Sequence, residues 1–168
     1  TEPSCKIDAL LELIEELGGA QATVFAESKQ LIDLAAKRLD KQKVTYTLLT
    51  GDVPESKRND NVKRFQAGDV QLFLATLGAG SESITLNAAA VSIFLQRSWS
   101  LVKNLQGEDR VQGIGQAADH VEVIDVVARN TLEEARLRVI GQKEARLHEI
   151  TRDPKMLYRL LSYDGGEM

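Results

Sequence analysis

The sequence predicts an α/β fold in which a parallel β-sheet is covered by helices on both faces. Short apolar and β-branched runs alternate along the chain with helical segments of about 10 to 15 residues, the order that βαβ units require. The 168 residues suffice for one domain with its own core, and 43% hydrophobic with 27% charged residues is an ordinary globular balance. That balance excludes collagen-like, coiled-coil and wholly disordered chains.

The first third of the chain contains two helix–strand pairs. Apolar residues recur at helical spacing over residues 6–17, and a glycine pair that follows ends this helix. The apolar run Ala22–Ala26 then predicts a buried strand. A second amphipathic pattern predicts a helix over residues 28–42, and the β-branched run Val44–Leu49 predicts the second strand.

The middle of the chain continues this alternation. Pro54 suits the first turn of a helix, which we expect to run to about Ala67. The runs Val70–Ala75 and Val91–Leu95 predict the third and fourth strands, and residues 101–112 predict a further helix.

The last part of the chain adds one strand and a long helix. Val121–Val127 predicts the fifth strand. Thr131 and Glu134 have the spacing of a capping box, which opens a helix that we expect to run to about Ile150. Asp153-Pro154 predicts the start of a short final helix.

Charge and cysteine content exclude several function classes. The net charge is −4, so no basic field covers the whole domain. Residues 27–64 nevertheless hold nine Lys or Arg and six Asp or Glu, which permits a local basic face or, alternatively, an ordinary solvated helix surface. Cys5 is the only cysteine, which excludes an internal disulfide and a multi-cysteine metal site. No apolar run approaches the length of about 18 residues that spans a membrane.

A Gly/Ser-rich segment follows the third strand, at the edge where ligands bind parallel sheets. Glycines at such a turn let backbone N–H groups approach a phosphate, although a tight turn needs small residues for its own sake. The spacing Gly78-x-Gly80-x-x-Ser83 also partly fits a dinucleotide fingerprint. That reading needs an acid after the next strand, where Gln96 stands instead.

A second candidate segment runs from Gln106 to Gln116. On a helix, Gln106 and Arg110 are four residues apart and share a face, and Asp109 could orient the guanidinium. An arginine at the edge of one domain can stabilise phosphate charge on a nucleotide bound to another domain. The alternative is a surface helix with an incidental arginine.

Taken together, these segments resemble the second RecA-like domain of superfamily-two helicases, and more closely that of Swi/Snf-type DNA translocases of the annealing-helicase-like branch in bacteria and phages. The resemblance covers about residues 5–155. In the family's order, the similar segments are Ala22–Lys29 for motif four, Leu49–Gly51 with Arg58 and Phe65 for the segment after it, Leu74–Ala89 for motif five, Arg97–Ser100 for the tryptophan segment, and Gln106–Gln116 for motif six.

The resemblance implies an ATP-dependent DNA translocase in which two RecA-like lobes clamp ATP and DNA lies across both. It assigns residues 1–152 to the helicase C-terminal domain and 153–168 to a C-terminal helix and tail, and it places the protein in the cytoplasm of a bacterial or phage-infected cell. Residues implied at the ATP site are Gly80, Glu82, Gln106 and Arg110, of which Arg110 is the catalytic one. Residues implied at the DNA backbone are Ser28, Lys29, Thr50, Gly51, Arg58, Thr76 and Trp99.

The chain departs from the family pattern at several positions. Gly113 stands where motif six usually has a second arginine, the one assigned as the arginine finger. Either the ATPase is slow or Arg97 or Arg129 substitutes for that group. Gly107 replaces a common alanine, which costs helix stability by roughly 1 kcal/mol.

No G-x-x-x-x-G-K-[ST] segment and no Asp-Glu-Ala-His-like motif occurs in the chain. ATP and Mg²⁺ are therefore expected to be held mainly by a first lobe of the same protein, and this lobe alone is expected to be inactive. We expect no protein-bound metal in this lobe. Two alternatives remain: a degenerate module that binds DNA or a protein partner without ATPase activity, and a free-standing nucleotide-binding domain.

Overall fold

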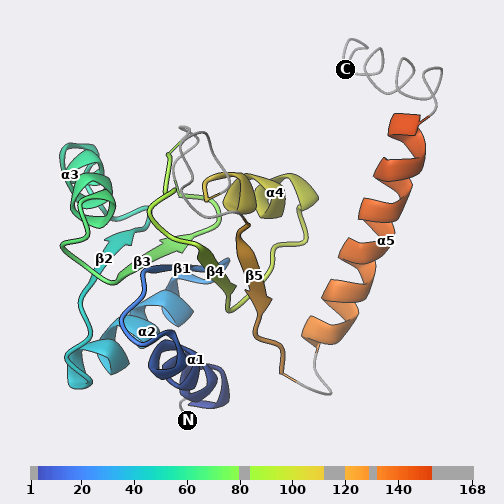
Figure 1. The fold of residues 1–168 in the computed structure, drawn as a ribbon. Helices are drawn as coiled ribbons and strands as arrows, with labels where there is room; N and C mark the ends of the chain where they lie inside the picture. The colour runs from blue at the N-terminus through green and yellow to red at the C-terminus, as the bar shows by residue number, and fades with distance from the viewer. Residues whose placement is uncertain (1–3, 80–83, 112–119, 129–131, 153–168) are drawn as a thin grey trace.

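The computed structural model describes residues 4–79, 84–111, 120–128 and 132–152, which form a five-stranded parallel sheet with helices on both faces (Figure 1). The strand order is β2-β3-β1-β4-β5, and every neighbouring pair is parallel. The predicted fold class is therefore confirmed. The strands are β1 (Ala22–Ala26), β2 (Tyr46–Leu49), β3 (Leu72–Thr76), β4 (Val91–Phe94) and β5 (Glu122–Asp125).

Four helices cover the sheet and a fifth leads away from it (Figure 1). Helices α1 and α2 pack on one face, where Ile7 and Ile32 join a buried cluster with Val24 of β1. Helices α3 and α4 lie over the other face, where Phe65 joins a second cluster with Phe25. The helices are α1 (Ser4–Leu17), α2 (Lys29–Lys41), α3 (Glu55–Gln66), α4 (Leu101–Asp109) and α5 (Leu132–Arg152).

Strand β1 lies at the centre of the sheet and contributes to both clusters. Its five residues are buried, and successive side chains point to opposite faces, so Val24 meets α1 and α2 while Phe25 lies 5.2 Å from the Phe94 ring on the other face. Burial of each large apolar side chain stabilises the fold by about 1.5 to 3 kcal/mol. A strand buried on both faces explains why this segment is apolar throughout rather than alternating.

The observed elements differ from the predicted ones mainly at their ends. Strand β2 begins at Tyr46 rather than Val44, because the Val44 N–H donates to the Leu39 carbonyl and so completes the end of α2. Helix α4 ends at Asp109 rather than near residue 112, because the Arg110 carbonyl accepts from the Leu86 N–H at 2.7 Å. The predicted final helix at residues 153–154 lies outside the described residues.

Helix α5 contacts the rest of the domain mainly through its first turns. Lys6 of α1 forms an ion pair with Glu133 and donates to the Leu95 carbonyl, which joins the starts of both helices to the end of β4. The remainder of α5 extends away from the sheet (Figure 1). Among the described residues, no helix combines the length and apolarity needed to cross a bilayer.

Gly107 and Gly141 lie in helices with very different surroundings. A Cβ at Gly107 would lie 3.0 Å from Leu77 Cδ2 and 3.4 Å from the Phe94 ring, whereas a Cβ at Gly141 would meet nothing within 4 Å. Gly107 therefore allows α4 to approach the sheet closely.

We predict that Gly107→Ala lowers the free energy of unfolding by about 1 kcal/mol, because overpacking that costs about 1 to 3 kcal/mol outweighs the gain in helix propensity. Gly141→Ala is the matched control and is expected to raise the same free energy by about 0.5 to 1 kcal/mol. Urea unfolding followed by circular dichroism measures both. Equal stabilisation by the two substitutions would contradict the close approach.

Candidate nucleotide and nucleic-acid site

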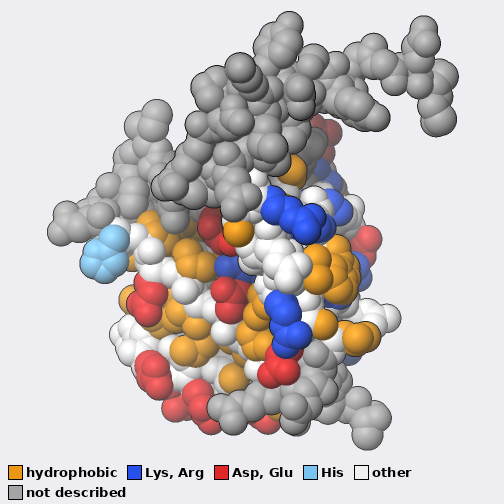
Figure 2. All heavy atoms as spheres, turned by 90° about the vertical axis from the view of Figure 1, so that its right-hand side faces the viewer, with side chains coloured by type: hydrophobic (Ala, Val, Ile, Leu, Met, Phe, Trp, Pro, Cys, Tyr) orange, Lys and Arg blue, Asp and Glu red, His pale blue; other side chains and the backbone are white. Residues whose placement is uncertain are grey.

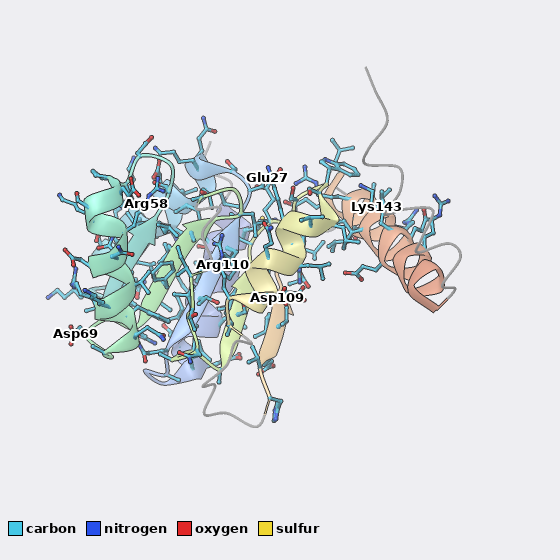
Figure 3. The ribbon with its side chains drawn as sticks, turned by 90° about the horizontal axis from the view of Figure 1, so that it is seen from above. Glu27, Arg58, Asp69, Asp109, Arg110 and Lys143 are labelled. Carbon is cyan, nitrogen blue, oxygen red and sulfur yellow. The ribbon has the colours of Figure 1, made fainter. Side chains whose placement is uncertain are left out.

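The segments predicted to carry function meet at the carboxyl edge of the sheet. Because the strands are parallel, the loops that follow β1, β2, β3 and β4 leave the sheet on the same side. The Ser28 N–H donates to Gln96 Oε1 at 2.9 Å, and Lys29 Nζ lies 2.9 Å from Asp52 Oδ2. These contacts join the loop after β1 to the loops after β4 and β2. Seen from above, Glu27 and Arg58 lie along this edge and Asp69 lies at the opposite one (Figure 3).

Lys29 is exposed at this edge but its charge is balanced. Its Nζ lies 2.9 Å from carboxylate oxygens of both Asp52 and Asp33. The hydrogen bonds that Lys29 donates to Asp52 and then Asp33, together with the charges of these carboxylates, raise the pKa of Lys29 above its usual value. The local excess of basic residues is therefore partly offset. On the side of the molecule that α5 occupies, described Lys and Arg side chains likewise lie among acidic and hydrophobic ones (Figure 2).

The other residues predicted at the DNA backbone differ in exposure. Gly51 is exposed and Arg58 is half-buried, with its Nε donating to the Val53 carbonyl at 3.1 Å. Thr50 and Thr76 are only 3% and 9% exposed, so their side chains lie largely beneath the surface of the edge. The edge as folded therefore presents Ser28, Lys29, Gly51, Arg58 and Trp99 to solvent more than the two threonines.

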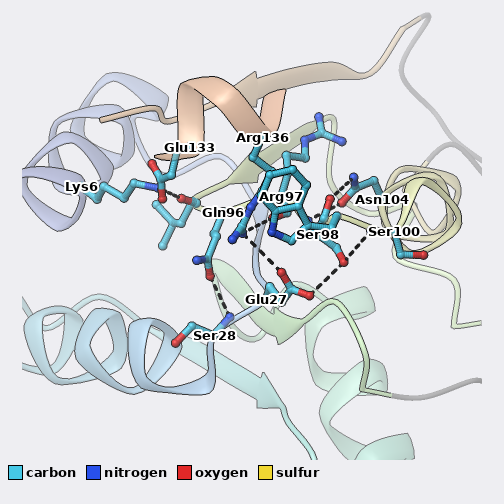
Figure 4. A network of polar contacts seen from close by, with 12 residues as sticks. Lys6, Glu27, Ser28, Gln96, Arg97, Ser98, Ser100, Asn104, Glu133 and Arg136 are labelled. Atoms are coloured by element: carbon cyan, nitrogen blue, oxygen red, sulfur yellow. Dashed lines mark hydrogen bonds and ion pairs between the residues drawn. The ribbon is translucent and has the colours of Figure 1, made fainter. Parts of the chain in front are cut away.

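A polar network shapes the loop between β4 and α4 (Figure 4). The Asn104 side chain accepts from the Ser98 N–H at 2.8 Å and donates to the Ser98 carbonyl at 2.9 Å. Ser98 Oγ donates to Glu27 Oε1 at 2.9 Å and accepts from the Ser100 N–H at 3.1 Å. Ser98 and Asn104 are buried. Ser98 and Glu27 lie within the motif segments predicted from the sequence but had no role of their own there, and sequence reasoning missed Asn104. The available signal was the pair of serines just before a predicted helix, because Ser100 is its N-cap.

Trp99 projects from this loop and is 44% exposed. The guanidinium carbon of Arg136 lies 5.1 Å from the centre of its ring, and Lys143 Nζ donates to its carbonyl at 2.7 Å. Both cations come from α5, so the predicted DNA-contacting tryptophan lies between the sheet edge and that helix.

Gln106 and Arg110, the two residues predicted to reach ATP from motif six, differ in how deeply they are buried. Gln106 is exposed, whereas Arg110 is 8% exposed and donates from Nη2 to the Ala79 carbonyl at 3.2 Å. Burial lowers the pKa of the Arg110 guanidinium from its usual value. Ala79 is the second residue of the predicted Gly/Ser-rich loop that begins at Gly78, so Arg110 links motif six to the start of that loop. Gly80, Glu82 and Gly113 lie outside the described residues.

Arg97 is held by structural contacts. Its guanidinium donates to both Asp125 oxygens, at 2.6 and 3.0 Å, pairs with Glu108, and lies 3.6 Å over the Phe94 ring. Burial alone lowers the pKa of Arg97, but the hydrogen bonds that it donates to Asp125 and Glu108 outweigh this effect and raise the pKa. In this arrangement the Arg97 guanidinium is paired with two carboxylates of its own lobe, which argues against its replacing the missing arginine of motif six. Arg129, the other candidate, lies outside the described residues.

Within the described parts of the chain, no cluster of three or more His, Cys, Asp or Glu side chains is arranged to hold a metal ion. The carboxylates of Glu27 and Asp52 also lie at the carboxyl edge, where the other polar groups are main-chain N–H groups, hydroxyls, amides and cations. These are groups that suit phosphates and position nucleic acid without reading its sequence.

Residues 5–118 match the family model described as the helicase conserved C-terminal domain. An ATP-dependent helicase, fft2, of Schizosaccharomyces pombe is 32% identical over 155 residues, covering 90% of this chain and 12% of that protein. The chromatin-remodeling ATPase INO80 of Arabidopsis thaliana is 30% identical over 138 residues, covering 82% of this chain and 9% of that protein. This chain thus spans about a tenth of the length of these relatives.

A relative of bacterial origin also matches: an uncharacterized ATP-dependent helicase of Mycoplasma genitalium is 28% identical over 166 residues, covering 97% of this chain and 16% of that protein. Relatives therefore come from eukaryotes as well as bacteria, and the bacterial or phage branch stays a prediction.

A solved structure has the same fold. The C-terminal part of the Fun30 ATPase domain superposes with a TM-score of 0.74 at 22% identity, covering 80% of this chain and 44% of that one. This likeness shows the fold, and the match of residues 5–118 to the family model shows the family. The chain belongs to the helicase conserved C-terminal domain family and is the second RecA-like lobe of a Swi/Snf-type superfamily-two helicase.

Proposed function

We propose that this lobe supplies motifs four to six of a DNA-dependent ATPase that translocates on DNA. The observation that carries the proposal is the meeting of the motif segments at the carboxyl edge, where Ser28, Gln96 and Lys29 join three loops. Residues 1–152 would form the lobe and residues 153–168 a separate C-terminal extension. ATP and Mg²⁺ would be held mainly by a first lobe, since this chain has no Walker-type segment.

The ATP-facing part would consist of the predicted residues around motifs five and six. Gly80 and Glu82 would face the nucleotide, and the exposed Gln106 would reach it from α4. The hydrogen bond from Arg110 to the Ala79 carbonyl supports a role for this arginine next to the phosphates. A guanidinium that burial has already desolvated interacts strongly with developing phosphate charge.

The DNA-facing part would lie on the loops after β1, β2 and β4. Ser28, Lys29, Gly51, Arg58 and Trp99 are at least partly exposed there and would contact the backbone. Thr50 and Thr76 are largely buried, so we expect them to support these loops and to contact DNA less than the exposed residues do. Contacts of this kind fix position on DNA and give little base specificity.

We predict that joining this lobe to a Walker-type lobe gives DNA-stimulated ATP hydrolysis. Arg110→Gln is expected to lower kcat by about 100-fold or more, and Gly113→Arg to raise it by about 10-fold or more, because an arginine finger contributes about 10³ to 10⁵. A coupled assay of ADP release with and without DNA measures both effects. Arg38→Gln, remote from the edge and paired with Asp8, is the control that should leave kcat unchanged.

The alternative, a module that binds DNA or protein without hydrolysing ATP, makes a different prediction. Hydrolysis would then be absent from both the native joined protein and its Gly113→Arg variant. Full native activity with no gain from Gly113→Arg would instead show that the missing arginine does not limit the rate. Tight ATP binding by this chain alone would favour a free-standing nucleotide-binding domain.

We also predict that Asp52→Asn strengthens DNA binding. Asp52 is 74% exposed and pairs with Lys29, so removing its charge leaves Lys29 with Asp33 as its one charged partner among the described residues and makes the cation more available to DNA phosphates. The dissociation constant for double-stranded DNA should fall about three- to tenfold at low salt, and its salt dependence should steepen. Fluorescence anisotropy of labelled DNA at several salt concentrations measures both.

Asp69→Asn removes the same charge at the opposite edge of the sheet and is the matched control (Figure 3). Equal tightening by the two variants would indicate an effect of net charge alone, and would contradict the placement of DNA at the carboxyl edge.

A further inference from the structure

Arg136 of α5 joins three parts of the carboxyl edge. Its Nη1 donates to the Arg97 carbonyl at 2.7 Å and to Glu27 Oε2 at 3.3 Å, and its guanidinium carbon lies 5.1 Å from the centre of the Trp99 ring. The side chain is only 17% exposed, although the C-terminal part of its helix extends away from the sheet (Figure 1). Its position among the β4 loop residues is visible in Figure 4.

Glu27 connects this arginine to the loop network. Its other oxygen accepts from Ser98 Oγ at 2.9 Å, so one carboxylate receives hydrogen bonds from the residue before Trp99 and from α5. Arg136 also holds the main chain at Arg97, two residues before the tryptophan. The two residues before Trp99 are therefore held from two sides: Ser98 by Glu27 at the end of β1, and Arg97 by Arg136 of α5.

A second cation on α5 contacts the same tryptophan. Lys143 follows Arg136 by two helical turns, which places both on one side of α5, and its Nζ donates to the Trp99 carbonyl at 2.7 Å. The Trp99 ring is thus contacted on its face while its backbone is held by a different residue. The Nε of Arg136 is buried without a hydrogen-bond partner among the described residues, so Nη1 and the ring contact hold the side chain.

We infer that Arg136 is a positioning residue that fixes the Trp99 ring and its loop from α5. A half-exposed indole on a loop can rotate, and a ligand that contacts it has to remove that freedom at a cost in binding free energy. A guanidinium over the face of the ring restricts the rotation before the ligand binds and so reduces the cost. Arginine suits this position because its planar group can stack on a ring while donating to two acceptors, which lysine cannot do in the same geometry. The inference deepens the proposed function, because it rests on Trp99 as a DNA contact.

Intrinsic fluorescence of the 168-residue chain tests the positioning directly, since Trp99 is the only tryptophan. In Arg136→Gln, the ring loses its cation and the carboxylate of Glu27 loses one donor. We expect a red-shifted emission maximum, stronger quenching by acrylamide and faster anisotropy decay than in the native chain. Arg136→Lys should give an intermediate result, because it restores the charge but not the planar group.

Arg138→Gln is the matched control, since Arg138 is an exposed arginine two residues after Arg136 in the same helix. It should leave the emission and quenching of Trp99 at native values. Far-UV circular dichroism and urea unfolding establish that each variant is folded before its fluorescence is compared. Unchanged quenching in a folded Arg136→Gln chain would overturn the inference.

The effect on DNA is measured in the protein that joins this lobe to its Walker-type lobe. Arg136→Gln should raise the DNA concentration for half-maximal ATPase stimulation about three- to tenfold and leave the KM for ATP unchanged. A change in Trp99 quenching with unchanged DNA response would support the positioning contact and count against Trp99 as a DNA contact. Failure of the inference and failure of the proposed function are therefore distinguishable.

Discussion

The polar network at the carboxyl ends of β1 and β4 is the interaction on which the candidate site depends. Glu27 and Ser28 follow β1, and Gln96 and Ser98 follow β4. The Ser28 N–H donates to the Gln96 side chain, and the Ser98 hydroxyl donates to the Glu27 carboxylate. Hydrogen bonds inside a protein are worth most where water is excluded, and a buried polar group without a partner costs about 1 to 3 kcal/mol. The network therefore holds two loops in one arrangement, and α2 and α4 begin from those loops.

Charge pairing bears on how this acidic chain would present the proposed nucleic-acid edge. Two aspartates balance the charge of Lys29, and an aspartate and a glutamate balance that of Arg97. The two cations nevertheless differ in their exposure to solvent. Lys29 is exposed, so a phosphate can compete with its carboxylates at little cost. Arg97 is buried, and its pairs hold α4 against β5. Position in the fold, rather than the number of basic residues, separates binding from structural cations.

Much of the fold could be predicted because its signals are local. Apolar runs such as Ala22–Ala26 and the spacing of apolar residues in α1 follow from burial on a sheet or a helix face. Strand ends were less predictable, as Val44 shows, because its N–H is used by the preceding helix rather than by the sheet. The burial of Arg110 and the full pairing of Arg97 could not be predicted, because their partners are distant in sequence: Ala79 is 31 residues from Arg110, and Glu108 and Asp125 are 11 and 28 residues from Arg97.

The sequence by itself determined the alternation of strands and helices, the order of the motifs and the absence of a Walker-type segment, because each of these is written in adjacent residues. Only the tertiary structure decided which polar side chains meet. Glu27, Trp99 and Arg136 come from three distant segments, and nothing in their spacing indicates contact. The parallel register brings the strand ends to one edge, and close packing there selects which charges are buried, paired or left to solvent.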